Sequence, residues 1–358
     1  MNDVRILAIN PGSTSTKIAV FQGTEPVFFK NIKHSSEDLL PYPRITDQFE
    51  FRKRIILEQL VEADINTDIV RVVMGRGGLL KPVPSGIYEV NERMIHDLVN
   101  SPLGEHASNL GGLIAHDLIN SIPGAKAYIA DPIVVDELEP IARIAGHPLF
   151  ERISIFHALN QKAIARDYAK AIRKKYEDLN LIVVHLGGGI TVGAHCKGRV
   201  IDVNQGLDGE GPFTPERSGT LPVSMLIRLC FSGTYTEKQV MKMVKGEGGL
   251  VAYLGTNNAV EVEKMVEDGN EKAKLIYDAM GYQVAKTIGE MYTVLKCEVD
   301  AILITGGIAY DKYFVNLIQE RVYKMAPIHV YPGEDEMRAL AMNGLMVIMG
   351  ELEPKEYT

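Results

Sequence analysis

The spacing of hydrophobic positions switches between two periods along the chain. Short runs of β-branched and aliphatic residues bounded by polar residues predict strands. These runs are 5–9, 17–21, 27–32, 69–73, 127–129, 153–156, 181–185, 191–195, 199–203, 301–305 and 328–331. Apolar residues at steps of three and four predict helices over 164–172, 273–295 and 337–348, and Asp311 is a candidate N-cap for a helix ending at Val322. The mixture predicts an α/β fold with packed sheets.

Two segments half a chain apart share one pattern. Residues 6–23 and 181–198 each read as an apolar strand, a polar residue, a turn with Gly and Ser or Thr, and a second strand ending in Gly. Asn10 matches His185 without gaps, an offset of 185 − 10 = 175 positions. Any two β-hairpins share some of this pattern, because tight turns favour Gly. The alternative is an internal duplication that gives two similar domains.

Glycine clusters are the candidate ligand-binding turns. Backbone N–H groups in a tight Gly turn can bind phosphate, since no Cβ blocks close approach. Such turns occur at 12–16 and 187–191, without a Walker or Rossmann pattern. The cluster 305–309 between a strand and a helix predicts an adenosine site or a packing turn. The cluster 245–249 precedes Asn257, which would contact a ribose or belong to a capped surface turn.

Composition and charge narrow the partners. The 358 residues are 46% hydrophobic and 23% charged, which excludes a disordered, collagen-like or coiled-coil chain. A net charge of −8 with no basic stripe argues against a nucleic-acid partner. Three separated cysteines argue against a disulfide framework or structural zinc site and fit a reducing cytoplasm. We expect no signal peptide and no membrane span.

The order of eight motifs resembles the acetate and butyrate kinase family, within the superfamily of sugar kinases, heat-shock chaperones and actin. The motifs are 10–17, 75–78, Asp131, 156–157, 185–189, 217–219, 306–308 and 331–336. The resemblance implies two duplicated actin-like (ribonuclease H-like) domains, with mixed sheets flanked by helices and an active-site cleft between the domains. We expect an acyl-substrate domain of 1–138 completed by 336–358, and a nucleotide-binding domain of 139–335.

Within that family the motifs are more similar to butyrate kinases. Acetate kinases carry Asn at the position of Gly188, extra His residues near Arg76, and an Asp-Thr-x-Phe pattern where this chain reads Asp131-Pro-Ile-Val-Val. The chain is also shorter. The alternatives are an acetate or propionate kinase, or a non-catalytic actin-like ATPase, which would need a large added interaction region. Homo-oligomers, dimers or larger, are implied by the resemblance only.

The implied reaction is reversible in-line phosphoryl transfer from ATP to a carboxylate, giving ADP and an acyl phosphate. A carboxylate is already nucleophilic, so catalysis rests on positioning and on neutralising charge. The resemblance implies five catalytic residues: Asn10, Arg76, Asp131, His157 and Arg217. We expect Arg76 and Arg217 to bind anions and His157 to donate to the transferred phosphoryl group or to cap its helix. His106 faces the acyl site or lies on a helix surface.

The remaining residues implied by the resemblance bind nucleotide and metal. The nucleotide set is Ser13, Ser15, His185, Gly187, Gly188, Gly189, Asn257, Gly306, Gly307 and Ile308. Mg²⁺ prefers oxygen ligands, and Asp335 is the expected carboxylate, with Glu334 or Glu336 as alternates and Asn10 nearby. The ordinary explanation of this acidic triplet is that it favours a helix dipole. Asp131 would hold a metal-bound water or position Arg76.

Overall fold

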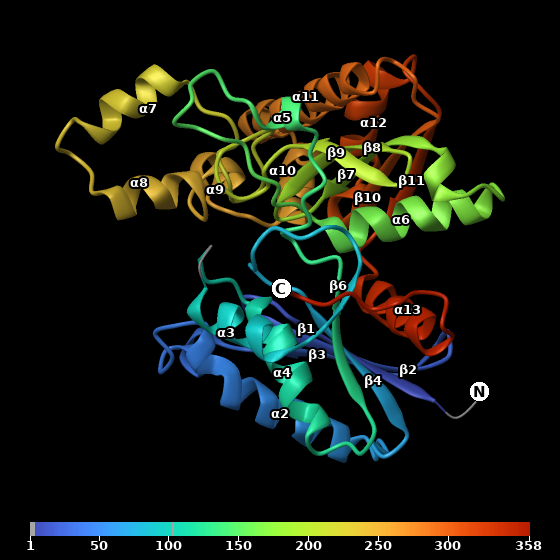
Figure 1. Cartoon of the computed structure of the whole chain (residues 1–358). Helices are drawn as coiled ribbons and strands as arrows, with labels where there is room; N and C mark the ends of the chain where they lie inside the picture. Colours follow the sequence, from blue (N-terminus) through green and yellow to red (C-terminus); the bar gives the residue numbers. More distant parts are fainter. Residues whose placement is uncertain (1–3, 102–103) are drawn as a thin grey trace. The chain divides into compact units, whose positions relative to one another are not determined.

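The computed structural model describes residues 4–101 and 104–358, which form two compact units (Figure 1). One unit extends to Val135 and includes the C-terminal segment from Asp335, and the other spans Asp136–Glu334. Each unit has its own sheet. No helix among the described residues is long and apolar enough to cross a membrane.

The first unit is built on a six-stranded mixed sheet in the order β3-β2-β1-β4-β6-β5. Its strands are β1 (Arg5–Pro11), β2 (Ser15–Gln22), β3 (Glu25–Lys33), β4 (Val70–Arg76), β5 (Ile87–Glu89) and β6 (Lys126–Ala130). Strand β1 pairs antiparallel with β2 and parallel with β4. The helices are α1 (Ser36–Leu39), α2 (Phe49–Glu62), α3 (Glu92–Asn100), α4 (Asn109–Ile119) and α13 (Glu336–Ile348).

Helices α4 and α13 cover opposite faces of this sheet. A Cβ at Gly75 would overlap the backbone of Gly111 in α4, whereas a Cβ at Gly344 of α13 would meet Val72 and Met74. Residues 72 and 74 point to one face of β4 and residue 75 to the other, because side chains alternate along a strand. Glycine at 75 therefore lets α4 approach β4 closely.

The second unit is built on a five-stranded sheet in the order β11-β10-β7-β8-β9. Its strands are β7 (Asn180–Leu186), β8 (Ile190–Cys196), β9 (Arg199–Val203), β10 (Ala301–Gly306) and β11 (Ile328–Pro332). The helices are α5 (Pro140–Arg143), α6 (Ala158–Ala171), α7 (Val223–Cys230), α8 (Glu237–Val244), α9 (Gly249–Leu254), α10 (Ala259–Glu267), α11 (Glu271–Val294) and α12 (Lys312–Val322). Ile182 and Val184 pack with α11 and α12 on one face. Leu181 and Val183 pack with α6 on the other.

The two sheets repeat one topology. In each, the first strand is antiparallel to the second, the second to the third, and the first is parallel to the fourth (β1, β2, β3, β4 and β7, β8, β9, β10). Gly23 and Gly198, matched by the 175-residue offset, both have left-handed backbones, with φ of 60° and 85°. The predicted fold of two duplicated α/β domains with mixed sheets flanked by helices is confirmed.

Several local predictions need correction. The run 153–156 is not a strand: Ile153 is exposed, and residues 154–156 form a buried loop in which the Ile155 carbonyl accepts from the Gly206 N–H. His106 lies in the loop before α4 rather than on a helix, with its Nδ1 2.7 Å from the Ser108 hydroxyl. Asp311 does cap α12, since its side chain accepts from the Phe314 N–H. Strand β5 and helices α1–α5 and α7–α10 were not predicted.

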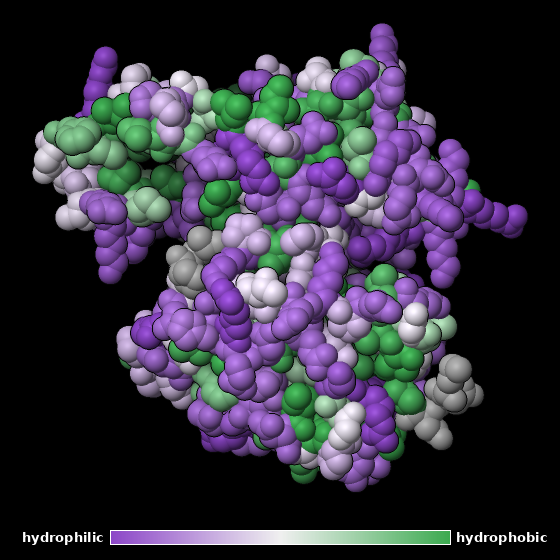
Figure 2. All heavy atoms as spheres, viewed as in Figure 1, coloured by the Kyte–Doolittle hydropathy of each residue, from purple (hydrophilic) through white to green (hydrophobic). Residues whose placement is uncertain are grey.

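Helices α7 and α8 form a hairpin with an apolar outer surface. Helix α7 has no buried residue. Figure 2 shows hydrophobic side chains gathered over this hairpin. The exposed apolar residues along it are Val223, Met225, Ile227, Phe231, Tyr235 and Met241, and Phe231 is 88% exposed.

Candidate active site

In the first unit, three predicted site residues form one cluster. Asn10 lies in β1, Arg76 ends β4, and Glu336 opens α13. Glu336 Oε2 accepts from Arg76 Nη1 at 2.8 Å and from Asn10 Nδ2 at 2.5 Å. Arg76 Nη1 also donates to Asn10 Oδ1 at 3.2 Å. The carboxyl ends of two parallel neighbours, β1 and β4, bring these side chains together, as is usual for α/β binding sites.

Asp131 follows β6 in the same unit and is 2% exposed. Its φ of 37° is unusual for a residue with a side chain. Its Oδ1 accepts from the Ser85 hydroxyl at 2.5 Å and from the Gly86 N–H at 2.9 Å. Asp131 therefore fixes the turn before β5, and its expected roles toward Arg76 or a metal-bound water stay predictions.

The turn between β1 and β2, which holds Ser13 and Ser15, is anchored from within by an arginine that sequence reasoning missed. Arg52 of α2 is fully buried. Its Nη1 donates to the carbonyls of Gly12 and Ser15, at 2.8 and 3.0 Å, and its Nη2 donates to the Ser13 carbonyl at 3.3 Å. Burial lowers the pKa of Arg52 to about 10. The sequence could have predicted its burial, because Arg52 stands four residues before Ile56 and eight before Leu60, on the buried face of α2.

In the second unit, the turn Gly187–Gly189 between β7 and β8 is closed by a hydrogen bond from the Gly187 N–H to the Gly189 carbonyl at 3.0 Å. A Cβ at Gly189 would overlap the Arg217 guanidinium, and one at Gly187 would lie 2.8 Å from Glu334 Oε1. A larger residue at 187 or 189 would therefore displace the side chain of Glu334 or Arg217. At Gly188 nothing lies within 4 Å of the Cβ position.

Two predicted histidines stack beside this turn. The His157 and His185 rings are 3.8 Å apart between centroids and within 13° of parallel. His157 occupies the N-cap position of α6, and its Nδ1 lies 2.9 Å from the Thr191 hydroxyl. His185 is held between Asn160 Oδ1 at 2.8 Å and Glu334 Oε1 at 3.1 Å.

Arg217 brings a cationic group to the same turn. Its Nη1 donates to the Gly206 carbonyl, while its buried Nε has no hydrogen-bond partner among the residues that the structure describes. Burial lowers the pKa of this guanidinium. A buried donor without a partner is costly, and here it lies beside a glycine turn in which a Cβ would be blocked. Both features fit a polyphosphate.

A cavity of about 320 Å³ adjoins the glycine turn and gathers most of the predicted nucleotide residues of this unit. Its lining includes Gly187, Gly188, Asn257, Gly307, Ile308 and Glu334. Gly306 does not line it, because its left-handed backbone packs on Leu186. The cavity also has an acidic wall that sequence reasoning missed, Glu263 and Asp311. Burial, and then the charge of Asp311, raise the pKa of Glu263.

A family model described as the acetokinase family matches residues 151–340 of the chain, which include the glycine turn, both stacked histidines and Arg217. The chain belongs to the acetokinase family. It is an ATP-dependent kinase of carboxylates.

Solved structures show the same fold at low identity. The chain is similar to an acetate kinase from Porphyromonas gingivalis, with 16% identity, a TM-score of 0.78, and coverage of 97% of this chain and 100% of that chain. A propionate kinase from Francisella tularensis subsp. tularensis SCHU S4 shares 18% identity over 95% and 98% of the chains, with a TM-score of 0.76. An Entamoeba histolytica acetate kinase shares 16% identity over 97% and 99%, with a TM-score of 0.75.

The three residues of the acidic triplet 334–336 lie in three different environments. Glu334 pairs with His185 in the second unit, and Glu336 contacts Asn10 and Arg76 in the first. Asp335 caps α13, accepting from the Arg338 N–H at 3.0 Å. Within residues 4–101 and 104–358, no group of three or more His, Cys, Asp or Glu is placed to hold a metal. A metal here would have to share its coordination with phosphate and water.

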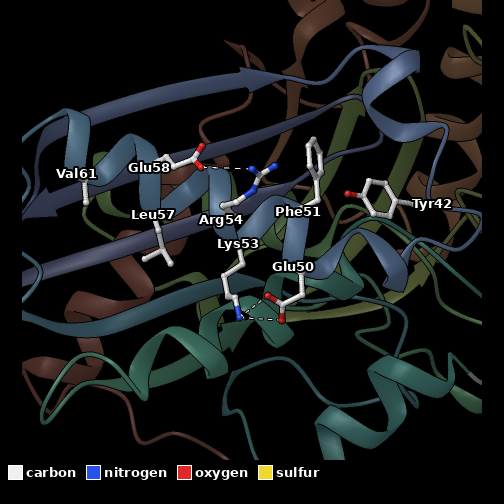
Figure 3. A pocket seen from close by; sticks show the side chains of 8 residues that line it. All are labelled: Tyr42, Glu50, Phe51, Lys53, Arg54, Leu57, Glu58 and Val61. Carbon is white, nitrogen blue, oxygen red and sulfur yellow. Dashed lines mark hydrogen bonds and ion pairs between the residues drawn. The ribbon is translucent and has the colours of Figure 1, made fainter.

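The first unit also has a groove of about 690 Å³ along α2 (Figure 3). None of the predicted site residues lines it. Its charged side chains pair with one another, Lys53 with Glu50 at 3.0 Å and Arg54 with Glu58 at 3.9 Å. We assign it no role in the chemistry.

Proposed function

We propose that this protein phosphorylates butyrate or a branched-chain analogue with MgATP, by direct and reversible in-line transfer. The cluster of Arg76, Asn10 and Glu336 carries the acyl half of the proposal. Arg76 presents a rigid cationic fork that suits a carboxylate or phosphate. In-line transfer needs no strong base, because the acceptor is already an anion.

An apolar segment lies next to Arg76. A Cβ at Gly77 would come 2.5 Å from the Pro132 side chain, so the arginine loop packs on the segment after β6. Pro132–Val134, with Pro84 and Ile87, are the expected lining of the acyl pocket. An alkyl chain placed there would leave its carboxylate near Arg76. Gly188 and the Asp131-Pro-Ile-Val-Val segment support an acid longer than acetate.

The second unit would hold the nucleotide. The glycine turn and Arg217 would bind the phosphates, and Gly307 and Ile308 would lie against the adenosine. Glu263 and Asp311 offer acceptors for ribose hydroxyls or an adenine amino group. His157 would donate a hydrogen bond to the transferred phosphoryl group, and His185 would hold the glycine turn. Ser13 of the first unit is exposed and would donate a hydrogen bond to the terminal phosphate.

Glu336 and Asn10 suit Mg²⁺ better than the predicted ligand Asp335 does. Glu336 and Asn10 supply a carboxylate and an amide within hydrogen-bond distance of each other. Mg²⁺ is usually bound by one or two carboxylates together with phosphate oxygens and water. When bound, the metal would neutralise charge on the phosphates. Asp335 already uses its carboxylate as a helix cap.

A hydroxamate assay with ATP and acids of rising chain length tests the proposal. One or two methylenes in an apolar pocket discriminate by about 10- to 200-fold in kcat/KM, so butyrate and isobutyrate should exceed acetate by at least about tenfold. A preference for acetate or propionate would favour the second candidate, which the fold likeness to acetate and propionate kinases supports. Absence of product with every acid would leave only a non-catalytic ATPase.

We propose that the enzyme is a cytoplasmic homo-oligomer. Its three cysteines are free, which suits a reducing compartment. The α7–α8 hairpin exposes apolar side chains along both helices, and stable interfaces bury roughly 800 Å² on each partner. A second copy of the same hairpin is a self-complementary occupant. Phe231→Asp with Met225→Asp should lower the molar mass in light scattering; an unchanged mass would place the interface elsewhere.

A further inference from the structure

A continuous chain of hydrogen bonds runs behind His157 through the second unit. This histidine relay consists, in order, of Tyr176, His195, Gln161, Thr191 and His157. The four joining distances are 2.6 Å from Tyr176 Oη to His195 Nδ1, 2.9 Å from His195 Nε2 to Gln161 Oε1, 2.9 Å from Gln161 Nε2 to Thr191 Oγ1, and 2.9 Å from Thr191 Oγ1 to His157 Nδ1. The three inner side chains are fully buried and Tyr176 is 5% exposed.

A backbone carbonyl fixes the direction of the relay. Gln161 Nε2 lies 3.1 Å from the Thr191 carbonyl oxygen, which can only accept. The amide nitrogen of Gln161 must therefore face Thr191, and its oxygen must face His195. His195 consequently carries its proton on Nε2 and accepts from the Tyr176 hydroxyl at Nδ1. Burial, followed by the charges of Lys162 and Arg166, lowers the pKa of His195 and keeps its ring neutral.

The direction of these hydrogen bonds also determines which ring nitrogen of a neutral His157 carries the proton. The Thr191 hydroxyl receives an N–H from Gln161, and its other hydrogen-bond neighbour in the described part of the chain is His157 Nδ1. A hydroxyl has one proton to donate, and Gln161 Nε2 cannot accept it. The proton therefore goes to His157 Nδ1, so that the neutral His157 ring carries its own proton on Nε2.

Two further features show that the relay is built into the fold. A Cβ at Gly193 of β8 would come 2.5 Å from Gln161 Oε1 and 3.2 Å from His195 Nε2, so glycine makes room for this hydrogen bond. Gln161 stands in the first turn of α6, four residues after His157. The start of α6 therefore positions His157 and also brings the Gln161 side chain into contact with Thr191 of β8.

We propose that the relay holds His157 as its Nε2–H tautomer and so presents a neutral hydrogen-bond donor, rather than a lone pair, to the transferred phosphoryl group. The catalytic half of this statement rests on the proposed function. Thr191, Gln161, His195 and Tyr176 are positioning residues that act through His157. The opposite tautomer would turn an acceptor toward an anion and lose the hydrogen bond.

The tautomer can be observed without any activity. In the full chain labelled with ¹⁵N-histidine, at about pH 8.5 where an ordinary histidine is neutral, long-range ¹H–¹⁵N spectra distinguish Nε2–H from Nδ1–H. His157→Gln and His195→Gln assign the signals. Both rings should be Nε2–H. A neutral His157 protonated on Nδ1 would overturn the proposal. If both rings are Nε2–H but the protein phosphorylates no acid, the proposed function is wrong. The relay's effect on the His157 tautomer would still be supported.

Thr191→Val then tests the consequence for turnover. Removing the hydroxyl should mix the two His157 tautomers and lower kcat about tenfold or more, with KM for ATP within about twofold. Thr191→Ser, which keeps the hydroxyl, should restore both the tautomer and kcat. Thr287→Val is the matched control, because Thr287 of α11 is also buried and its hydroxyl donates to the Gln283 carbonyl of the same helix. Unchanged kcat and tautomer in Thr191→Val would refute the relay.

Discussion

Thr16 and Thr191 stand at equivalent positions of the duplicated domains, 191 − 16 = 175 residues apart, and each contacts a histidine. Thr16 Oγ1 accepts from buried Arg52 at 3.0 Å and lies 2.8 Å from His34 Nε2. Thr191 Oγ1 accepts from buried Gln161 and lies 2.9 Å from His157 Nδ1. The same local motif therefore serves two different histidines.

The two histidines, His34 and His157, differ in what surrounds their rings. His34 is 6% exposed and packs edge-on against Phe51 at 5.4 Å, so its ring belongs to the core of its unit. His157 stacks on His185 and lies against Gly189 of the glycine turn. The duplicated hairpin supplies the two threonines, whereas the two histidines come from different segments, one after β3 and one before α6.

The two units also differ in how they offer binding groups. In the first, side chains of opposite charge meet, as in Arg76 with Glu336 at 2.8 Å. In the second, the glycine turn borders a cavity, and Arg217, whose Nε has no hydrogen-bond partner in the described part of the chain, lies against Gly189 of that turn. The first arrangement suits a small anion with a metal, and the second suits a polyphosphate.

The largest expected effect comes from removing the guanidinium group of Arg217 in the second unit. Arg217→Ala should lower kcat about a thousandfold, as loss of a phosphate-binding arginine typically does, with thermal unfolding little changed. The hydroxamate rate measures it. Arg321→Ala, an exposed arginine on α12, is the control and should retain activity. Near-normal turnover in Arg217→Ala would remove Arg217 from the site.

The next effect distinguishes two neighbouring carboxylates of the first unit. Glu336→Gln should lower kcat about a hundredfold and raise the Mg²⁺ concentration needed for half-maximal rate, because the substitution removes the negative charge of the only carboxylate in the proposed Mg²⁺ donor set. Asp335→Asn should stay within about twofold, since Asn is an equally good helix cap. The readout is the rate against Mg²⁺ concentration. The reverse order of effects would return the metal to Asp335.

Much of the fold could be predicted from the sequence, because strands appear as short apolar runs bounded by polar residues. The apolar runs of β7 and β8 and the glycine between them predicted both the hairpin and its repeat. The run 153–156 misled, because buried loops and strands can share an apolar composition. Helix α2 was missed because Arg52, a charged residue, occupies its buried face.

The site was less readable, because its partners are distant in sequence. Glu334, Asp335 and Glu336 are chemically alike, and only the start of α13 decides which one faces Asn10. The bond between Gln161 and Thr191 joins residues 30 positions apart. Nothing in the spacing of polar residues in α6 shows that Gln161 is fully buried and bonded to a strand.

A smaller effect is expected from crowding the glycine turn. Gly189→Ala should raise KM for ATP about tenfold, since the added methyl would overlap the Arg217 guanidinium. Gly188→Ala is the matched variant and should change KM less, because its Cβ position is open. Neither residue has a left-handed backbone, so strain does not distinguish them. Equal KM values would show that Arg217 moves aside freely.

The smallest effect concerns pH and the core histidine of the first unit. Burial, followed by the charge of Arg52, lowers the pKa of His34 from 6.5 to about 4. Between these values the unfolded chain binds a proton that the folded chain does not, so stability should fall as pH falls through this interval. Each pH unit within this interval should cost at most about 1.4 kcal/mol of stability.

His34→Gln should abolish this part of the acid sensitivity, because glutamine can still accept from Thr16 and does not titrate. Urea unfolding at about pH 7 and about pH 4.5 measures the difference between the two free energies of unfolding. His96→Gln on α3, whose side chain is 73% exposed, is the control and should behave like the unsubstituted protein. Equal acid sensitivity in His34→Gln would mean that burial beside Arg52 does not keep the His34 ring neutral.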